Sequence, residues 1–221
     1  MRFMFCFFGL FLVASCAPAR FVEPLDKGEW SVGANLGGPV LDFGGAPIPV
    51  PLSAVEVGYG LDSSLTVHGA LHATSMLFGN GQLDLGVTYK FVNQNKWIPN
   101  VSVSPGVNVI YSPSAKTGKL WPMLDLNAYW NYGKRTNYIY LGVNNYFELS
   151  RTMANNQPQN HNWLFSPQLG HILKGKKDKW EMITEFKYIG PNISSEYSFI
   201  PYQGIVNQGA IGFYLGVRRK F

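Results

Sequence analysis

The stretch "QLDLGVTYKF" (82–91) alternates apolar residues with small or polar ones along its whole length. Successive side chains of a β-strand point to opposite faces, so this order puts the bulky apolar groups on one side. That side carries Leu83, Leu85, Val87, Tyr89 and Phe91, and the other carries Gln82, Asp84, Gly86, Thr88 and Lys90. The period of two predicts a strand with one apolar and one polar face.

The same period recurs on both sides of this stretch, whereas helical periodicity is almost absent. Ten strands are predicted, over residues 29–37, 53–61, 64–74, 82–91, 100–111, 120–132, 138–149, 163–174, 180–190 and 207–221. Pro105, Pro122 and Pro167 fall inside three of them. Because proline lacks the N–H that a strand donates to its neighbour, we expect bulges or strand starts there. If the prolines broke their strands, the number of strands would fall to eight.

The connections between the predicted strands alternate in length. Those after the second, fourth, sixth and eighth strands are tight, as in "DSS" (62–64) and "GKKDK" (175–179). Those after the first, seventh and ninth strands are long: "GGPVLDFGGAPIPVP" (37–51), "RTMANNQPQNHN" (151–162) and "PNISSEYSFIPYQGIV" (191–206). Short turns at one rim and long loops at the other are typical of β-barrels that span outer membranes.

The composition indicates which face meets which solvent. Charged residues make up only 14% of the chain, and the polar faces consist largely of Gly, Ser, Thr, Asn and Gln. A soluble barrel would turn its apolar face inward and coat the outside with charges. A basic side chain facing the middle of a bilayer costs about 2–4 kcal/mol, and the apolar faces carry almost none. We therefore predict an all-β fold: a closed antiparallel up-and-down transmembrane β-barrel with a polar interior over residues 29–221.

The N-terminal stretch "MRFMFCFFGLFLVASC" (1–16) has a basic Arg2 followed by uncharged residues. It is typical of a signal-peptide core and too short to span a bilayer. Its last four residues, Val13 to Cys16, resemble the lipobox of bacterial lipoprotein signal peptides. This resemblance implies removal of residues 1–15, lipidation of Cys16 and, because Ala17 follows, sorting to the outer membrane; an ordinary signal peptide is the alternative. Residues 16–28 are then expected to form a lipidated, extended tether.

The segment 29–221 resembles the small β-barrel proteins of the bacterial outer membrane. The stretch "GFYLGVRRKF" (212–221) resembles the last strand that the barrel-insertion machinery recognises in that class, with Phe213, Leu215, Val217 and Phe221 matching and Arg219 departing from the pattern. The resemblance implies outer-membrane lipid and the insertion machinery as partners. It also implies a Gram-negative cell envelope as the location, with the lipid anchor in the periplasmic leaflet.

Four inward-facing residues could carry chemistry. Pairing the second, third and fourth predicted strands brings Glu56, His68, His72 and Asp84 into one interior patch. Such a patch could bind a metal, or act as base and orienter in a lipid or peptide hydrolase. We favour the alternative that it is a structural hydrogen-bond network, with Lys187 and Arg218 as counter-ions for the interior carboxylates. No nucleophile with a local motif accompanies the patch, so we assign no catalytic or metal-binding residue and no cofactor.

The function that follows is that of a barrel whose interior is filled by side chains. About eight strands enclose just enough room for side chains, and open pores need about sixteen. We expect a structural role, or a surface-interaction role in which the long loops contact an unknown ligand. The alternatives are an enzyme or metal site at the patch and a lipid-anchored soluble ligand-binding barrel, since "KGEW" (27–30) resembles the early Gly-x-Trp of lipocalins. Nucleic-acid binding is not expected, because the basic residues behind the net charge of +5 lie in separate turns.

Overall fold

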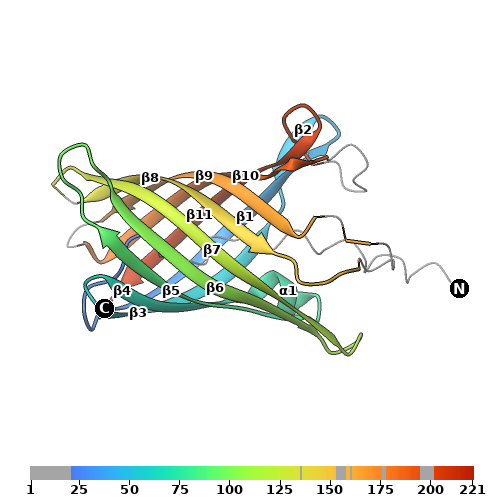
Figure 1. Cartoon of the computed structure of the whole chain (residues 1–221), viewed down its shortest axis with the longest axis horizontal. Helices are drawn as coiled ribbons and strands as arrows, with labels where there is room; N and C mark the ends of the chain where they lie inside the picture. The colour runs from blue at the N-terminus through green and yellow to red at the C-terminus, as the bar shows by residue number, and fades with distance from the viewer. Residues whose placement is uncertain (1–20, 135, 153–157, 160, 176–177, 195–201) are drawn as a thin grey trace, which may run out of the picture.

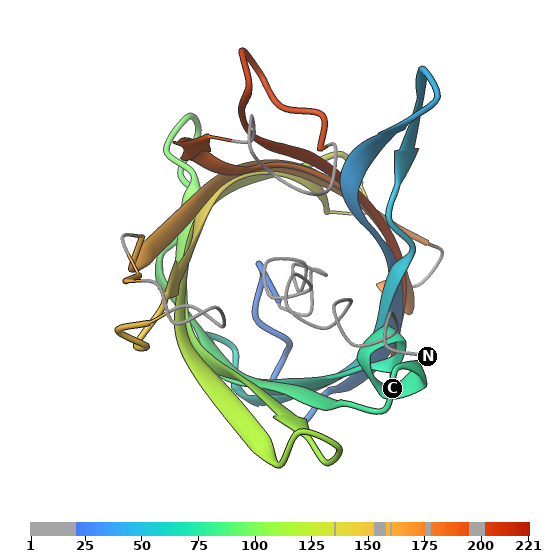
Figure 2. The ribbon, with the colours of Figure 1, turned by 90° about the vertical axis from the view of Figure 1, so that its right-hand side faces the viewer.

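The computed structural model describes residues 21–134, 136–152, 158–159, 161–175, 178–194 and 202–221. Ten strands form one closed antiparallel barrel (Figures 1 and 2): β1 (Trp30–Phe43), β3 (Leu52–Asp62), β4 (Leu65–His72), β5 (Gly81–Val92), β6 (Asn100–Ser112), β7 (Thr117–Tyr132), β8 (Asn137–Phe147), β9 (Trp163–Lys174), β10 (Trp180–Ser194) and β11 (Gln208–Lys220). Each strand pairs with its neighbours in the chain, and β11 pairs with β1. The predicted ten-stranded, up-and-down barrel is confirmed.

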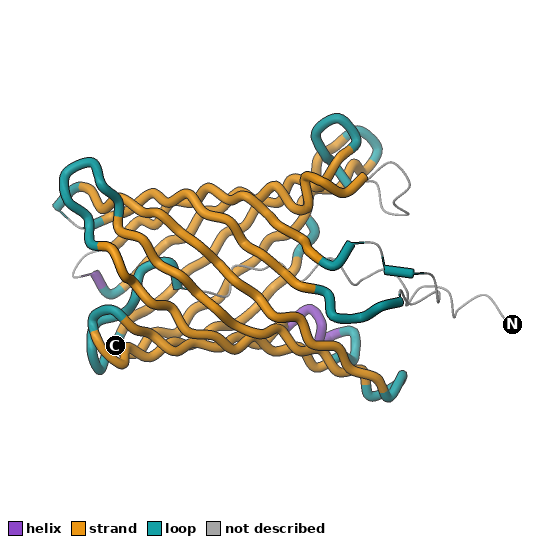
Figure 3. Tube along the Cα trace, in the orientation of Figure 1, coloured by secondary structure: helices purple, strands orange, loops and turns teal. Residues whose placement is uncertain are grey.

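Two further elements lie outside the barrel wall. The strand β2 (Ala46–Pro49) pairs only with the end of β1, across a turn in which Gly44 and Gly45 have φ values of 64° and 88°. The helix α1 (Ala73–Leu77) connects β4 to β5, where the sequence predicted that the strand would continue to Thr74. Figure 3 shows this helix in purple beside strands that run obliquely around the barrel. Within the described residues, no helix has the length and apolarity needed to cross a membrane.

The two rims differ in their connections. The turns β3–β4, β5–β6, β7–β8 and β9–β10 are short and lie at the rim where the chain ends, which we call the short-turn rim. The β1–β2 hairpin, α1 and the connections β8–β9 and β10–β11 lie at the opposite, long-loop rim (Figure 1). The predicted alternation of short and long connections is therefore present. The connection between β6 and β7 is an exception, because it is short. The two strands form a long hairpin that stays paired up to Ser112 and Thr117.

The three prolines lie inside strands, but each lies where the pairing on one side is interrupted or ends. The β5–β6 pairs run as far as Gly86–Gly106 and resume only at Tyr89–Val103, so Pro105 falls in the gap. The β7–β8 pairs begin one residue after Pro122, at Met123, and the pairs of β9 with β10 begin one residue after Pro167, at Gln168. The expectation of bulges or strand starts was wrong, because the missing N–H is accommodated without a shift of register. The strands are not broken, and the barrel keeps ten of them.

Burial is inverted relative to a soluble protein. Apolar side chains on the outer surface, such as Val32, Leu141 and Leu215, are 46%, 52% and 49% exposed. Polar and charged side chains of the same strands, such as Glu185 and Arg218, are buried in the interior. The closed sheet satisfies the backbone N–H and C=O groups within the barrel wall. The apolar band around it gives lipid an apolar surface to contact. The predicted arrangement, with apolar residues outside and polar residues inside, is confirmed.

Candidate functional site

A short stretch of chain lies inside the barrel. Residues 21–28, which we call the plug segment, precede β1 and enter the interior from the short-turn rim; Figure 2, viewed along the barrel, shows them in blue inside the ring of strands. Phe21, Val22 and Leu25 are buried. Gly28, with φ 82°, lets the chain reverse direction, and its N–H donates to the Gly60 carbonyl at 2.8 Å. Residues 21–28 are therefore not part of an extended tether, as was expected for residues 16–28, and their position inside the barrel was not predicted.

Hydroxyl groups of the barrel wall hold the backbone of the plug segment. The wall strands use their own N–H and C=O groups for one another, so a segment in the interior needs side-chain partners. Thr88 Oγ1 donates to the Phe21 carbonyl at 2.8 Å, and Ser102 Oγ donates to the Val22 carbonyl at 2.7 Å. The Leu25 N–H in turn donates to Thr66 Oγ1 at 2.7 Å. Small hydroxyl residues on the inward face therefore serve as a docking surface.

Glycines on β3 make room for the plug segment. A Cβ atom on Gly58 would lie 2.5 Å from the Phe21 ring, and one on Gly60 would lie 2.0 Å from the Asp26 carbonyl oxygen. Both distances are shorter than any van der Waals contact, so a larger residue would displace the segment. On the other side, Val22 packs into an apolar cluster of the interior with Tyr129, Tyr138, Tyr140, Ile172 and Ile183. The plug segment therefore packs against small glycines on one side and against an apolar cluster on the other.

Charged side chains also hold the plug segment in place. The Phe21 ring lies 3.9 Å from the Arg218 guanidinium, which also bonds Glu56 at 2.8 Å and Glu181 at 3.1 Å. The plug residue Glu23 pairs with Lys174 at 2.5 Å. Buried charges are tolerated when they are paired and hydrogen-bonded, as these are. The prediction that Arg218 neutralises interior carboxylates is confirmed.

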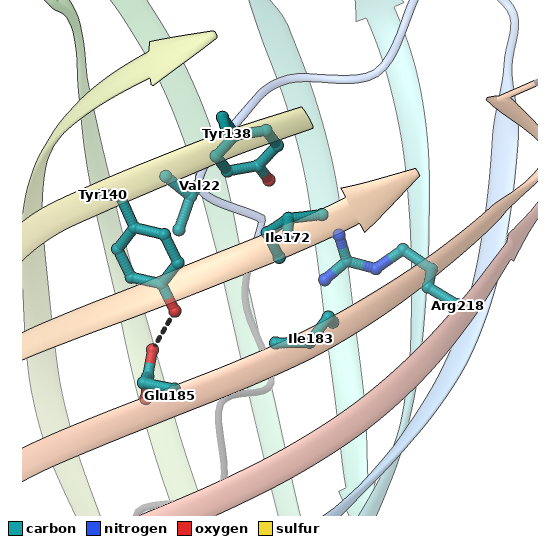
Figure 4. Close-up of a pocket in the computed structure, with 7 residues that line it drawn as sticks. All are labelled: Val22, Tyr138, Tyr140, Ile172, Ile183, Glu185 and Arg218. Carbon is teal, nitrogen blue, oxygen red and sulfur yellow. Dashed lines mark hydrogen bonds between the residues drawn. The ribbon is translucent and has the colours of Figure 1, made fainter. Parts of the chain in front are cut away.

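Little space remains around the plug segment. The cavity in Figure 4, lined by Val22, Tyr138, Tyr140, Ile172, Ile183, Glu185 and Arg218, has a volume of about 10 Å³. A single water needs about 10–15 Å³. The Tyr140 hydroxyl donates to Glu185 across it, as the dashed line in Figure 4 shows. This cavity, as the described residues form it, is therefore too small for a solute.

The interior nearer the long-loop rim is filled by side chains of the wall itself. Gln168 Nε2 donates to Asn127 Oδ1 at 2.8 Å, and Asn144 donates to Asp125. Lys187 lies 3.5 Å from Glu185, and its ammonium group lies 5.4 Å from the Tyr214 ring. The prediction that Lys187 acts as a counter-ion is also confirmed. The contacts described in this half of the interior are made mainly by amide side chains, together with Tyr214.

Comparisons with known proteins agree with this architecture. No family model and no curated protein matches the sequence. The chain is similar to the translocator domain of the autotransporter NalP from Neisseria meningitidis, at 9% identity over 90% of this chain and 91% of that one, with a TM-score of 0.50. It is equally similar to an outer membrane channel from Pseudomonas putida F1, at 9% identity over 90% and 98% of the two chains, with a TM-score of 0.50. The fold is that of an outer-membrane β-barrel. At this identity the likeness extends to the fold alone.

Within this outer-membrane barrel, the four residues of the predicted patch separate into three environments. His72 Nε2 lies 2.9 Å from Asp84 Oδ2, because Asp84 pairs with Ala70 and is therefore diagonal to His72. Glu56 bonds Arg218, and the His68 ring lies 5.7 Å from the Phe21 ring. Among the described residues, no group of three or more His, Cys, Asp or Glu side chains could hold a metal ion.

The His72–Asp84 pair belongs to a longer chain of hydrogen bonds. Asn108 Nδ2 donates to Asp84 Oδ1, and Gln82 Nε2 donates to Asn108 Oδ1 at 3.2 Å. Ser75, from α1, donates to Gln82. The carboxylate that would orient a catalytic histidine is thus also fixed by an amide. This geometry favours the interpretation of the patch as a structural network.

The residues of the predicted insertion signal lie on the outer surface. Phe213, Leu215 and Val217 alternate with inward residues of β11, and the Phe221 N–H donates to the Trp30 carbonyl at 2.8 Å. Arg219, the position out of pattern, has its guanidinium 5.4 Å from the Trp180 ring and 4.8 Å from the Phe221 ring. It therefore lies among aromatic side chains at the short-turn rim, as its long stem allows. Cys16, the predicted lipidation site, lies outside the described residues.

Proposed function

We propose that this protein is a lipid-anchored barrel of the bacterial outer membrane that its own N-terminal segment keeps closed, and that it acts through the loops at its long-loop rim. The observation that carries the proposal is the buried plug segment with its ion-paired surroundings. Ten strands fall between the roughly eight that side chains fill and the roughly sixteen of open pores. A closed state of such a barrel needs additional material in the lumen, and Phe21, Val22 and Leu25 supply it.

Reconstitution into planar bilayers tests the closed state. In the full mature chain, changing Phe21→Asp and Leu25→Asp places two carboxylates against apolar surroundings and should expel the plug segment. The matched control is Lys27→Asp, an exposed position of the same segment. We expect steady ion conductance from the double variant only. Steady conductance from the wild type would overturn the proposal that the barrel is closed.

Exposed apolar side chains support an interaction role for the long-loop rim. Phe43, Leu77 and Val206 are 75%, 85% and 89% exposed, and they belong to three different connections at that rim. Exposed apolar groups on three loops of one rim are candidates for contact with a partner. An unidentified surface ligand is therefore the proposed partner of this rim.

Site-specific photo-cross-linking in intact cells tests that role. A photo-reactive side chain at position 77 should capture a partner, whereas one at Trp97, 91% exposed at the short-turn rim, should not capture the same partner. Equal capture at both positions, or none at position 77, would contradict the surface-interaction role.

The lipid anchor is compatible with the position of the plug segment. Phe21 packs against Gly58, which is four residues, or about 13 Å of strand, from the β3–β4 turn. The five residues back to Cys16 reach at most about 17 Å. A lipid on Cys16 can thus reach the membrane at the short-turn rim, which in this proposal is periplasmic. Palmitate labelling should be lost in Cys16→Ser and kept in Cys6→Ser; labelling that survives Cys16→Ser would exclude this anchor.

A hydrolase at the predicted patch is the second candidate, and only the 2.9 Å His72–Asp84 pair favours it. If the pair is catalytic, His72→Ala should abolish hydrolysis of phospholipid or peptide by the detergent-solubilised barrel without unfolding it. If the pair is structural, as we propose, His72→Ala should weaken the barrel and change no turnover. The outward apolar band gives no support to a soluble ligand-binding barrel.

A further inference from the structure

The plug segment consists of a held part and a free part. Its first five residues, with the sequence "FVEPL" (21–25), are buried or half-buried, whereas residues 26–28 are exposed. Wall side chains from six different strands contact the first five residues. We call these side chains the peptide dock: Thr66, Thr88, Ser102, Asn131, Lys174 and Arg218.

The barrel wall itself keeps the peptide dock in position. Thr66 and Thr88 are paired residues of β4 and β5, so their backbones are fixed by the sheet. Arg218 is fixed by Glu56 at 2.8 Å and by Glu181 at 3.1 Å, both of which belong to other strands. A site whose groups are already in place loses little conformational entropy when a ligand binds. The peptide dock is therefore a preformed site for a peptide.

The peptide dock selects for an acidic residue at the third position. Lys174 Nζ lies 2.5 Å from Glu23 Oε2, and Asn131 Nδ2 donates to Glu23 Oε1 at 3.1 Å. The Lys174 side chain is only 6% exposed. A ligand without a carboxylate here would leave this buried ammonium group without its counter-ion, which is costly. Such a penalty against the wrong ligand is a source of specificity.

The other four positions are selected by space and by backbone hydrogen bonds. The Phe21 ring occupies the space beside Gly58 and lies 3.9 Å from the Arg218 guanidinium, an arrangement that favours an aromatic residue. Pro24 is buried and has no N–H, so it leaves no donor unsatisfied. The N–H of Leu25 donates to the dock. Wall hydroxyls donate to the carbonyls of the first two residues whatever their side chains.

We propose that the peptide dock, once the plug segment leaves it, binds an extended peptide of another chain with the pattern aromatic, aliphatic, acidic, proline, aliphatic. Anchoring an extended peptide by its backbone and by pockets for particular side chains is a general mode of peptide recognition. The exposed residues 26–28 lead out at the short-turn rim, so such a peptide would enter from that side. This inference rests on the proposed function, in which the plug segment can be released.

Fluorescence anisotropy with a synthetic peptide tests the proposal. The probe is "FVEPLD" (21–26), acetylated at its N-terminus and labelled with fluorescein at its C-terminus. We expect the detergent-solubilised double variant Phe21→Asp, Leu25→Asp to bind the probe. In the wild type the plug segment occupies the peptide dock, so the probe should bind at least about tenfold more weakly.

A second comparison tests the selection for an acidic residue. In the same double variant, the probe with Glu23→Gln should bind at least about tenfold more weakly than the original probe, because it lacks the charge that pairs with Lys174. Adding Lys174→Met to the double variant should abolish this difference between the two probes. The matched control is Lys179→Met, at an exposed position of the following turn, which should preserve the difference.

Three results would overturn the proposal: equal binding of the probe by the wild type and the double variant, equal binding of the two probes, or a difference that survives Lys174→Met. If the double variant binds no probe, the variant Phe21→Ser, Val22→Ser, Glu23→Ser decides, because little of its own plug remains to compete; no binding there refutes the site. Heat-modifiability on gels establishes that each variant is folded. A double variant that conducts ions but binds no probe leaves the proposed function intact, whereas steady conductance of the wild type overturns that function and not the binding result.

Discussion

The two halves of the barrel interior are filled in different ways. Next to the short-turn rim, in what we call the plugged half, the plug segment lies inside the barrel. Glu23 of this segment pairs with Lys174, and further charged residues of the wall lie around it: Glu56, Glu181, Arg218 and Lys220. Next to the long-loop rim, in what we call the outer half, amides and tyrosines of the wall meet one another directly, with fewer ion pairs.

The difference means that closing the barrel and building its wall depend on different parts of the interior. The outer half is part of the sheet, so it cannot empty without unfolding the barrel. Beyond its covalent link to β1, the described part of the plug segment is held by hydrogen bonds, the Glu23–Lys174 ion pair, the Arg218–Phe21 contact and packing. None of these contacts belongs to the sheet, so we expect that the segment can leave while the sheet stays intact. Buried ion pairs hold their geometry only while every member is present, so the plugged half should also be the more sensitive half to substitution.

Arg218→Ala should have the largest effect on stability. It leaves Glu56 and Glu181 buried without their cation and removes the guanidinium from the Phe21 ring. Breaking a buried pair in this way costs about 3–5 kcal/mol. Urea unfolding from lipid vesicles measures the loss. Arg219→Ala, one residue later on the outer face, should cost about 1 kcal/mol or less; equal losses would show that the inward position has no special role.

Gly58→Ala should come next. Its new methyl group would overlap the Phe21 ring, and overpacking of this kind costs about 1–3 kcal/mol. Phe21→Ala should rescue part of that loss in the double variant, because it removes the atoms in conflict. Gly81→Ala is the control, since the nearest atom to its Cβ position is 4.0 Å away. A double variant as unstable as the sum of the two single ones would contradict docking of Phe21 on Gly58.

Gln168→Leu probes the outer half and should have a smaller effect. It removes the 2.8 Å bond to Asn127 and keeps most of the volume. Removing the donor of a buried acceptor costs about 1–3 kcal/mol, below the roughly 3–5 kcal/mol expected for the Arg218 ion pairs. The same urea assay measures it. A loss as large as that of Arg218→Ala would mean that the two halves do not differ in sensitivity.

The sheet could be predicted from the sequence because each strand carries its own signal. Period-two patterns gave all ten barrel strands, and β9 has the predicted bounds of 163 and 174. The scarcity of charge on the apolar faces correctly turned those faces outward. The hairpin of β1 and β2 was missed because its Gly44–Gly45 turn stands within a loop rich in proline, a composition that indicates irregular structure.

The candidate site was only partly predictable, because its contacts join distant parts of the chain. His72 and Asp84 lie on neighbouring strands and were brought together correctly. Glu56 and Arg218 are 162 residues apart and meet only through closure of β11 on β1. The plug segment has no periodicity, and its partners are hydroxyls spread over three strands. Its only signal is a pair of apolar residues, Phe21 and Val22, in a stretch otherwise suited to a solvated tether.

The smallest effect is expected beyond the outer half, at Glu148 after the end of β8. Burial alone would raise the pKa of this carboxyl, but the Ser150 N–H at 2.7 Å and the Trp121 indole N–H at 2.9 Å, with Lys119 nearby, hold the pKa below its ordinary value of 4.5. A lowered pKa in the folded state stabilises the loop above pH 4.5, and this contribution is lost as the pH falls through the lower, folded value.

The NMR signal of the Trp121 indole N–H, assigned with Trp121→Phe, should therefore stay constant from pH 7 to 5 and shift only below 4.5. Glu148→Gln should remove the shift. A midpoint above 4.5, or a shift that persists in Glu148→Gln, would mean that this carboxylate does not anchor the loop.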